Sequence, residues 1–81
     1  MSFYVYLICS KNNSNRLVSY VGYTNDLNKR VHLHNSSKGA KFTKGKKWTL
    51  LYKKKFSFKN DAMKYEYLLK KDRIKREKIK K

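Results

Sequence analysis

The sequence has no proline, three glycines, one cysteine and only five acidic residues among its 81 positions. A single cysteine, Cys9, excludes an internal disulfide framework, so we expect a reducing, intracellular setting, either cytoplasmic or nuclear. We place this thiol as a small apolar residue in a buried strand. No apolar run approaches the roughly 18 residues that a membrane span needs, and the first residues lack a basic leader. These absences predict a protein that neither enters a membrane nor is secreted.

Positive charge is what the chain has in excess. Its 22 lysines and arginines against five acidic residues give a formal net charge of +17. A field of that strength predicts a polyanionic partner, bound with an affinity that falls as salt rises. Nucleic acid is the leading candidate. An anionic membrane surface is the alternative, but no helix combines a basic face with a bulky apolar one as a membrane-surface helix would. The 40% of hydrophobic residues suffices for one small packed domain.

The order of apolar and polar residues predicts an α+β domain with a small three-stranded antiparallel sheet flanked by helices. Runs rich in aromatic and β-branched residues indicate strands at 3–9, 17–23 and 48–58. The polar cluster 10–15 between the first two strands is typical of a hairpin turn.

Helices are expected between and after these strands. The first begins at Asp26, is capped by Thr24 or Asn25, and ends near residues 35–37. The second is capped by Asn60 and runs from Asp61 to about residue 71. Residues 38–47 are expected to be a basic loop. Residues 1–71 then make up the main domain, and 72–81 are a basic helix or tail of the same domain.

Helical geometry places several charged residues. Leu27, Val31 and His34 share one stripe, and Arg30 lies beside it, so Arg30 and His34 should project together from the rim of the face that packs on the sheet. In the later helix, Glu66 falls in the same sector as the inward residues 62, 65 and 69. A carboxylate on the apolar side of a helix is costly unless a cation or metal compensates it.

Each of these residues also has a simpler interpretation. Tyr6 and Tyr20 are by pattern typical of core or cross-strand aromatics, Arg30 of a solvated base, and Glu66 of a surface partner for lysine. His32 and His34 are two apart on a helix and point in different directions, so no structural zinc site is expected there. Only their combination is informative.

The joint order of these residues resembles the GIY-YIG nuclease domain, in its compact single-domain form that is sometimes called URI. The resemblance covers the chain from residue 3 to about 71, although Tyr4 stands where the first motif has glycine. The matching segments are Tyr4-Val5-Tyr6, Tyr20-Val21-Gly22, residues 26–35, residues 39–43, Trp48 and residues 62–66.

The resemblance implies metal-dependent hydrolysis of a DNA phosphodiester. It implies that Glu66 holds one divalent ion, Mg²⁺ or Mn²⁺, and that Arg30 contacts the scissile phosphate. Tyr6 and Tyr20 would line the site, and one of them would help to deprotonate the attacking water. His34, which only some members have, would assist that proton transfer.

DNA contacts are expected outside this site, where lysines grip a backbone without reading bases. We expect an endonuclease that is structure-selective or weakly sequence-specific, acting in repair or recombination as a monomer or weak homodimer. The residues expected to contact DNA are Lys38, Lys41, Lys44, Lys46, Lys47, Lys70 and Arg73.

Two other classes stay open. One is a non-catalytic nucleic-acid-binding protein that kept the fold, and the other is a small subunit that acts only with a larger protein partner. A set of phenols, guanidinium and carboxylate favours catalysis, because a purely binding protein has no need of it. The sequence does not indicate which tyrosine is the base.

Overall fold

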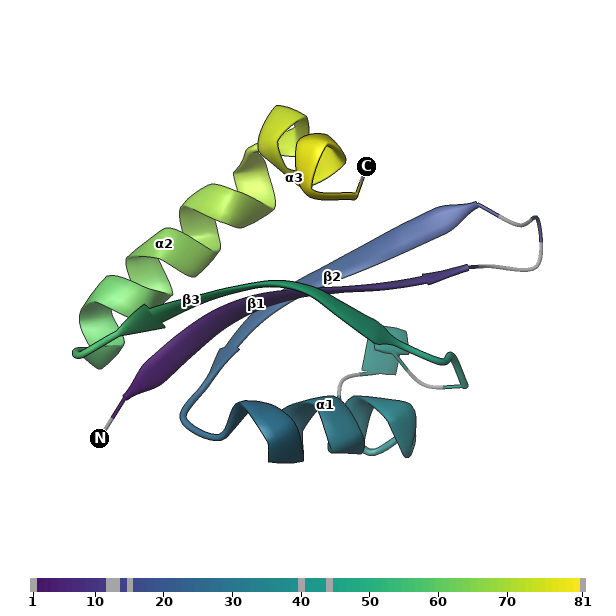
Figure 1. Cartoon of the computed structure of the whole chain (residues 1–81), viewed down its shortest axis with the longest axis horizontal. Coiled ribbons are helices and arrows are strands. Elements are labelled where there is room, and N and C mark those ends of the chain that lie inside the picture. The colour runs from purple at the N-terminus through teal and green to yellow at the C-terminus, as the bar shows by residue number, and fades with distance from the viewer. Residues whose placement is uncertain (1, 12–13, 15, 40, 44, 81) are drawn as a thin grey trace.

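The computed structural model describes residues 2–11, 14, 16–39, 41–43 and 45–80. Three strands, β1 (Phe3–Lys11), β2 (Leu17–Thr24) and β3 (Thr49–Phe56), form one antiparallel sheet in the order β2-β1-β3. The first two strands pair as a hairpin, which confirms the expected pairing. The central strand is therefore the first one in the sequence (Figure 1).

β1 is apolar from Phe3 to Cys9, as expected of a strand whose sheet is covered on both faces. Successive side chains of a strand point to opposite faces. Val5, Leu7 and Cys9 join a core cluster on one face, and Tyr6 and Ile8 join a second cluster on the other. The thiol of Cys9 is buried as expected, and burial raises its pKa.

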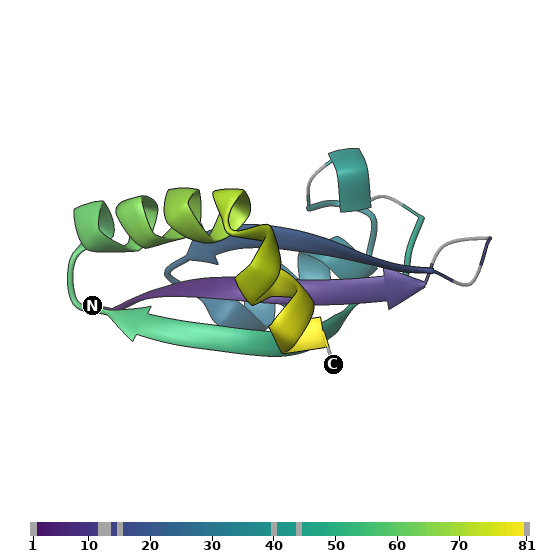
Figure 2. The same cartoon turned by 90° about the horizontal axis from the view of Figure 1, so that it is seen from above.

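Helices cover the two faces unequally. α1 (Leu27–Asn35) lies against one face, and α2 (Lys59–Lys71) and α3 (Arg73–Lys80) lie against the other (Figure 1). Ala62, Leu69 and Ile79 complete the first cluster, whereas Leu27 and Val31 pack against the second. Seen from above, α2 and the short 3-10 helix η1 (Lys41–Thr43) both lie on the β2 side of the sheet (Figure 2). The α+β arrangement is confirmed.

The boundaries of two helices differ from the sequence prediction. Asp26 is the N-cap of α1 and not its first residue, because its Oδ1 accepts a hydrogen bond from the Lys29 amide at 3.2 Å. α2 begins two residues before the predicted start, with Phe58 as an N-cap that makes no side-chain cap bond. Asp61 therefore lies inside the first turn, where its charge suits the positive end of the helix dipole.

The basic tail is a docked helix. Lys75 of α3 donates a hydrogen bond from Nζ to the Tyr65 hydroxyl at 2.7 Å, and that hydroxyl lies 2.5 Å from the hydroxyl of Tyr52 on β3. Ile79 packs against the core on the same side. α3 is thus held to both α2 and the sheet. Within the described residues, no helix is long and apolar enough to cross a membrane.

Candidate active site

A series of hydrogen bonds joins β1, α1 and the loop that follows α1. Arg30 Nε donates to the Tyr6 hydroxyl at 3.4 Å, and the same hydroxyl lies 2.8 Å from His34 Nε2. A Tyr6 hydroxyl that accepts from Arg30 can donate to His34 Nε2, and a neutral His34 that accepts there carries its proton on Nδ1. That nitrogen lies 2.9 Å from Thr43 Oγ1. The series therefore runs from Arg30 through Tyr6 and His34 to Thr43.

The inner members of this series are fully buried. Tyr6, His34 and Thr43 each have 0% exposure, so the prediction that His34 lies at the rim of α1 is wrong. The reason is tertiary, because the chain after α1 returns over the last turn of the helix and places η1 against the imidazole. Arg30 is half-buried, as a rim residue should be.

Burial also sets the protonation states. It lowers the pKa of His34, and the nearby Arg30 charge lowers it further, so the imidazole is neutral at neutral pH. Burial raises the pKa of Tyr6, while the hydrogen bond and charge of Arg30 act in the opposite direction. The hydrogen bond to Tyr6 in turn raises the pKa of Arg30. A protonated phenol thus faces a neutral imidazole that can accept its proton.

Two glycines make room for these rings. A Cβ on Gly22 would come within 2.7 Å of Tyr6 Cζ, and a Cβ on Gly39 would come within 2.9 Å of His34 Cε1. Both distances are shorter than real Cβ contacts allow. Gly22 of the second motif triplet therefore leaves room for the ring of Tyr6 of the first triplet, which is its partner across the β1–β2 pair.

Gly39→Ala is expected to push the His34 ring away from Tyr6, because the added methyl overlaps a fully buried ring. We expect a loss of about 1–3 kcal/mol of unfolding free energy, the usual cost of overpacking. The displacement should appear as a changed His34 pKa in an NMR titration.

Gly45→Ala is the matched control. Gly45 has a φ of +77° and no atom near its missing Cβ, so alanine there strains only the backbone. This variant should also lose stability but keep the His34 titration. An unchanged His34 titration in Gly39→Ala would contradict the packing argument.

The loop that carries Thr43 is anchored at several points. Asn35 accepts a hydrogen bond from the Trp48 amide at 2.6 Å and donates one to the Trp48 carbonyl at 3.2 Å. The Trp48 indole donates to the Thr43 carbonyl at 2.9 Å. Sequence reasoning treated Thr43 and Trp48 only as motif positions and missed these bonds. The amide side chain of Asn35 at the end of α1 was the available signal, but its residue type does not specify its partner.

Tyr20 lies beside the hydrogen-bonded series. Its ring is 5.1 Å from that of His34, and its partly exposed side chain is close enough to act electrostatically on Tyr6 and Arg30. Its other neighbour is Phe42, whose ring is nearly parallel to that of Tyr20 with centroids 6.2 Å apart. Tyr20 is thus the site phenol that solvent reaches, whereas Tyr6 is enclosed.

Glu66 approaches the same region from α2. Its side chain is 18% exposed and pairs with Lys70 at 3.4 Å, so it is not turned into bulk solvent. Burial is the largest cause of the raised pKa of Tyr6, and the Glu66 charge adds to it, so the carboxylate lies within electrostatic range of the phenol. The structure therefore brings four of the five predicted site residues together, and the fifth, Glu66, acts on Tyr6 through its charge from α2.

Glu66 fits a hard divalent cation, although it would act with few protein ligands. In the part of the chain that the structure describes, no group of three or more His, Cys, Asp or Glu is placed to hold a metal ion. Mg²⁺ keeps several waters and often binds one or two carboxylates together with substrate phosphates. Lys70 is half-exposed, so it can release the carboxylate to such an ion.

A hollow of about 480 Å³ opens beside Arg30. Phe3, Tyr23, Asn25 and Lys59 line it together with Arg30, so two cations border open space at the end of β2. A phosphate entering there meets the guanidinium, whose Nε is already engaged by Tyr6.

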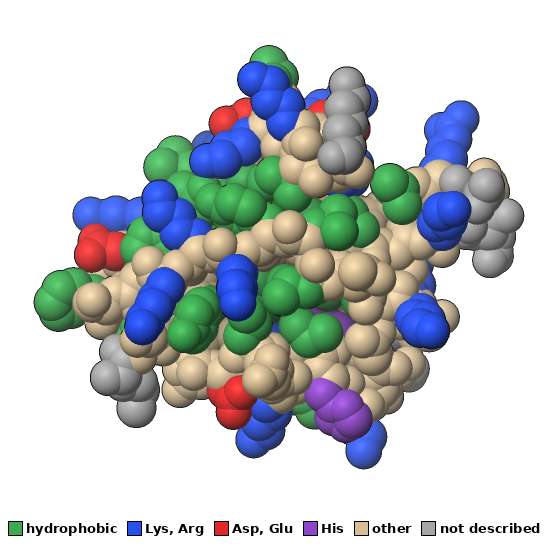
Figure 3. Space-filling model, in the orientation of Figure 1, with side chains coloured by type: hydrophobic (Ala, Val, Ile, Leu, Met, Phe, Trp, Pro, Cys, Tyr) green, Lys and Arg blue, Asp and Glu red, His purple; other side chains and the backbone are tan. Residues whose placement is uncertain are grey.

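Of the predicted DNA-contacting residues that the structure describes, Lys70 pairs with a predicted site residue. Lys46 is half-buried and lies beside Phe42, Lys70 pairs with Glu66, and Lys44 lies outside the described residues. Basic side chains are distributed around the whole outline of the face in Figure 3. The exposed members of the predicted set are Lys38, Lys41, Lys47, Lys70 and Arg73.

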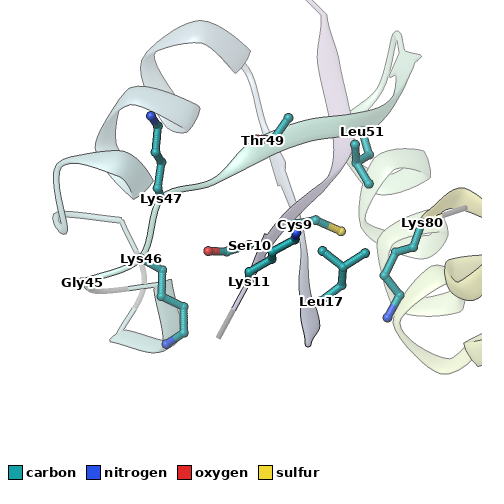
Figure 4. Close-up of a pocket in the computed structure, with 10 residues that line it drawn as sticks. All are labelled: Cys9, Ser10, Lys11, Leu17, Gly45, Lys46, Lys47, Thr49, Leu51 and Lys80. Atoms are coloured by element: carbon teal, nitrogen blue, oxygen red, sulfur yellow. The ribbon is translucent and has the colours of Figure 1, made fainter. Parts of the chain in front are cut away.

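Another hollow, of about 840 Å³, lies between the far end of the sheet and the C-terminal end of α3 (Figure 4). Cys9, Leu17 and Leu51 give it apolar walls. The lysines that border it are Lys11, Lys46, Lys47 and Lys80. Neither Tyr6 nor Tyr20 lines this hollow. The candidate active site is therefore the one around the Tyr6 hydroxyl, where the hydrogen bonds from Arg30 and His34 meet.

The chain is similar to known proteins over most of its length. The family model of the GIY-YIG catalytic domain matches residues 2–80. The UPF0213 protein YazA of Bacillus subtilis is 46% identical over 69 residues, which are 84% of this chain and 66% of that protein. A UPF0213 protein of Oceanobacillus iheyensis is 43% identical over 68 residues, which are 83% of this chain and 74% of that protein.

A solved structure agrees with the fold. The solution NMR structure of a UPF0213 protein from Bacillus halodurans has a TM-score of 0.52 and 36% sequence identity to this chain. The similarity covers 98% of this chain and 82% of that one. The three-stranded sheet with its helices is therefore shared.

Proposed function

This chain belongs to the GIY-YIG catalytic domain family, a family of nucleases, and we propose that it is a divalent-metal-dependent endonuclease that hydrolyses DNA phosphodiester bonds. The observation that carries the proposal is the bonded series from Arg30 through Tyr6 to His34, with Glu66 in electrostatic range. A fold kept only for binding does not need a buried phenol between a guanidinium and a neutral imidazole. A role in repair or recombination is part of the proposal.

Arg30 would hold the scissile phosphate. Its Nε is bonded to Tyr6, and its remaining N–H groups can meet the phosphate in the adjoining hollow with two parallel hydrogen bonds. This charge stabilises the negative charge that develops on the phosphoryl oxygens. Glu66 would hold the metal ion, which supplies Lewis-acid stabilisation of the phosphate oxygens when bound.

Tyr6 and His34 would move the proton of the attacking water. A phenol has an ordinary pKa of about 10 and is a poor base until it loses its own proton. Neutral His34, 2.8 Å away, can accept that proton while Arg30 stabilises the phenolate left on Tyr6. Because Tyr6 is enclosed, the water would reach its hydroxyl from the Arg30 side, where the hollow of about 480 Å³ opens. Tyr20 would border the path of that water.

The direct test is incubation with supercoiled plasmid and Mg²⁺ or Mn²⁺, with EDTA as the control. We expect nicking that depends on the ion. Plasmid binding without nicking would favour a binding protein, and nicking only after addition of a second protein would favour a subunit of a larger assembly. Equal cleavage of linear duplex and branched DNA would remove structure selectivity from the proposal.

The pH dependence of cleavage should report His34. The imidazole must be neutral to accept the Tyr6 proton, and its pKa lies below the ordinary 6.5. The rate should therefore be flat near neutral pH and fall as the pH drops through that lowered pKa. His34→Gln should remove this acid limb and slow cleavage by about a hundredfold, the usual contribution of a proton-transfer residue.

His32→Gln is the matched control, because His32 is exposed on the same helix and contacts only the Ser36 side chain at 3.4 Å. It should leave both the rate and the acid limb in place. If His34→Gln keeps the acid limb, another group accepts the proton and the relay is wrong.

A further inference from the structure

Phe42 is an exposed aromatic ring at the edge of the candidate active site. Its side chain is 51% exposed, whereas its neighbours Thr43 and Trp48 are buried at 0% and 3%. The ring contacts those of Tyr20 and Trp48, and no step of the proposed mechanism uses its exposed part. Its position next to Tyr20 therefore asks for another explanation.

The ring belongs to a series of aromatic side chains that begins at the hydrogen-bonded phenol and continues to Trp48, whose ring centroid is 6.2 Å from that of Phe42. Centroid distances are 5.7 Å from Tyr6 to His34, 5.1 Å from His34 to Tyr20, and 6.2 Å from Tyr20 to Phe42. The last pair is within 20° of parallel. The exposed part of Phe42 thus extends the aromatic surface of the site into solvent.

The backbone holds this ring in place. Phe42 belongs to η1, whose next residue Thr43 is bonded through its side chain to His34 and through its carbonyl to the Trp48 indole. Trp48 is in turn fixed by two hydrogen bonds to Asn35. A ring anchored in this way loses little conformational freedom when it binds a ligand, which favours affinity.

A cation accompanies the ring. Lys46 Nζ donates to the Phe42 carbonyl at 3.3 Å and lies over the Phe42 ring, 5.3 Å from its centroid, so a base that stacks on this face would displace the ammonium toward the adjoining phosphate. Lys46 also borders the 840 Å³ hollow with its further lysines (Figure 4). A flat apolar surface next to an ammonium group, followed by a basic hollow, matches the alternation of base and phosphate in an unpaired nucleic acid strand.

We propose that Phe42 is a stacking platform for an unpaired nucleobase of the DNA strand that lies in the site, and that Lys46 holds a phosphate next to that base. A base inside a duplex is stacked on both faces and offers no free face to the ring. The substrate is then DNA with unpaired nucleotides next to the scissile bond, as at a flap or branch. This inference rests on the proposed nuclease function and specifies its substrate class.

The test measures binding separately from cleavage. The whole chain carrying Glu66→Gln, in EDTA, is titrated by fluorescence anisotropy with a duplex that bears a short single-stranded flap. A second flap keeps the phosphates but carries abasic spacers. We expect the abasic flap to bind about tenfold more weakly, because the stacking contribution is lost.

Phe42→Leu should bind the normal flap about tenfold more weakly and show no further loss with the abasic flap, whereas Phe42→Trp should keep the preference. Phe58→Leu is the matched control, since Phe58 is 69% exposed at the N-cap of α2 and lies outside the aromatic series. Lys46→Gln should weaken both flaps equally and reduce the salt dependence.

The chain that carries Glu66→Gln and keeps Phe42 decides the question. If it binds the normal and abasic flaps equally, the proposed stacking role of Phe42 is wrong, whatever the stability of the variants. Phe42-dependent binding that is tighter for the same flap made of RNA would overturn the assignment to DNA. Failure of the proposed nuclease function shows elsewhere, as absence of plasmid nicking by the wild-type chain, so the two failures are distinguishable.

Discussion

Glu66→Gln is expected to lower DNA cleavage by about a thousandfold or more while DNA affinity stays within a few-fold of the wild type. The amide has the shape of the carboxylate but lacks its charge, and a hard divalent cation bound by one protein carboxylate depends on that charge. Lys70, which pairs with Glu66 at 3.4 Å, is freed by the change and keeps the surface basic. Plasmid nicking in Mg²⁺ and anisotropy with labelled DNA measure the two quantities.

Glu77→Gln is the matched control for this prediction. It makes the same change of charge on α3, where Glu77 pairs with Lys80 at 2.9 Å and has no contact with the site phenols. Its cleavage rate should equal that of the wild type. Removal of the metal with EDTA should reproduce the Glu66→Gln result. Wild-type nicking by Glu66→Gln, or nicking that survives EDTA, would refute the assignment of the metal to this residue.

Arg30→Lys is expected to have a comparable effect on cleavage, again with DNA binding largely retained. Arg30 makes one hydrogen bond through Nε to Tyr6 and has further N–H groups for the phosphate. An ammonium keeps the charge but cannot reproduce this fixed fork. The variant loses both the grip on the phosphate and the hydrogen bond that counteracts the raised pKa of Tyr6. We expect a fall in kcat of about a hundred- to a thousandfold, the usual result of removing a donor aimed at developing charge.

Arg73→Lys controls for the substitution itself, because Arg73 is exposed on α3 and was expected only to contact DNA. It should leave kcat unchanged. A kcat for Arg30→Lys equal to that of the wild type would show that charge alone is needed at this position, and the bidentate role would have to be abandoned. A rise in KM with no change in kcat would place Arg30 in substrate binding alone.

The elements could be predicted from the sequence because local physical rules determine them. β1 is apolar from Phe3 to Cys9, the polar cluster after it predicts a turn, Asp26 caps α1, and Asp61 lies in the first turn of α2. The predicted start of α2 is too late in the sequence. Its N-cap is Phe58, which makes no side-chain hydrogen bond that a sequence pattern would reveal. The residue set Tyr6, Arg30 and Glu66 was also found in the sequence, since its order resembles a known family.

The environment of each residue in the site was harder to predict from the sequence. His34 follows Arg30 by one helical turn, which by itself predicts a place at the helix rim. Its burial depends on Thr43 and Gly39, which lie in a loop whose path no periodicity describes. The bonds from Asn35 to Trp48 that fix this path join groups 13 residues apart.

By itself, then, the sequence determined the strands and helices, the excess of positive charge and the chemical groups available for catalysis. These follow from side-chain type and short-range spacing. Tertiary structure decided which phenol is enclosed and which is open, that His34 is neutral and bonded to Tyr6, and that Phe42 stands exposed beside Tyr20. The physical reason is that burial and hydrogen-bond partners depend on long-range packing, and those two factors set the pKa and accessibility of each group.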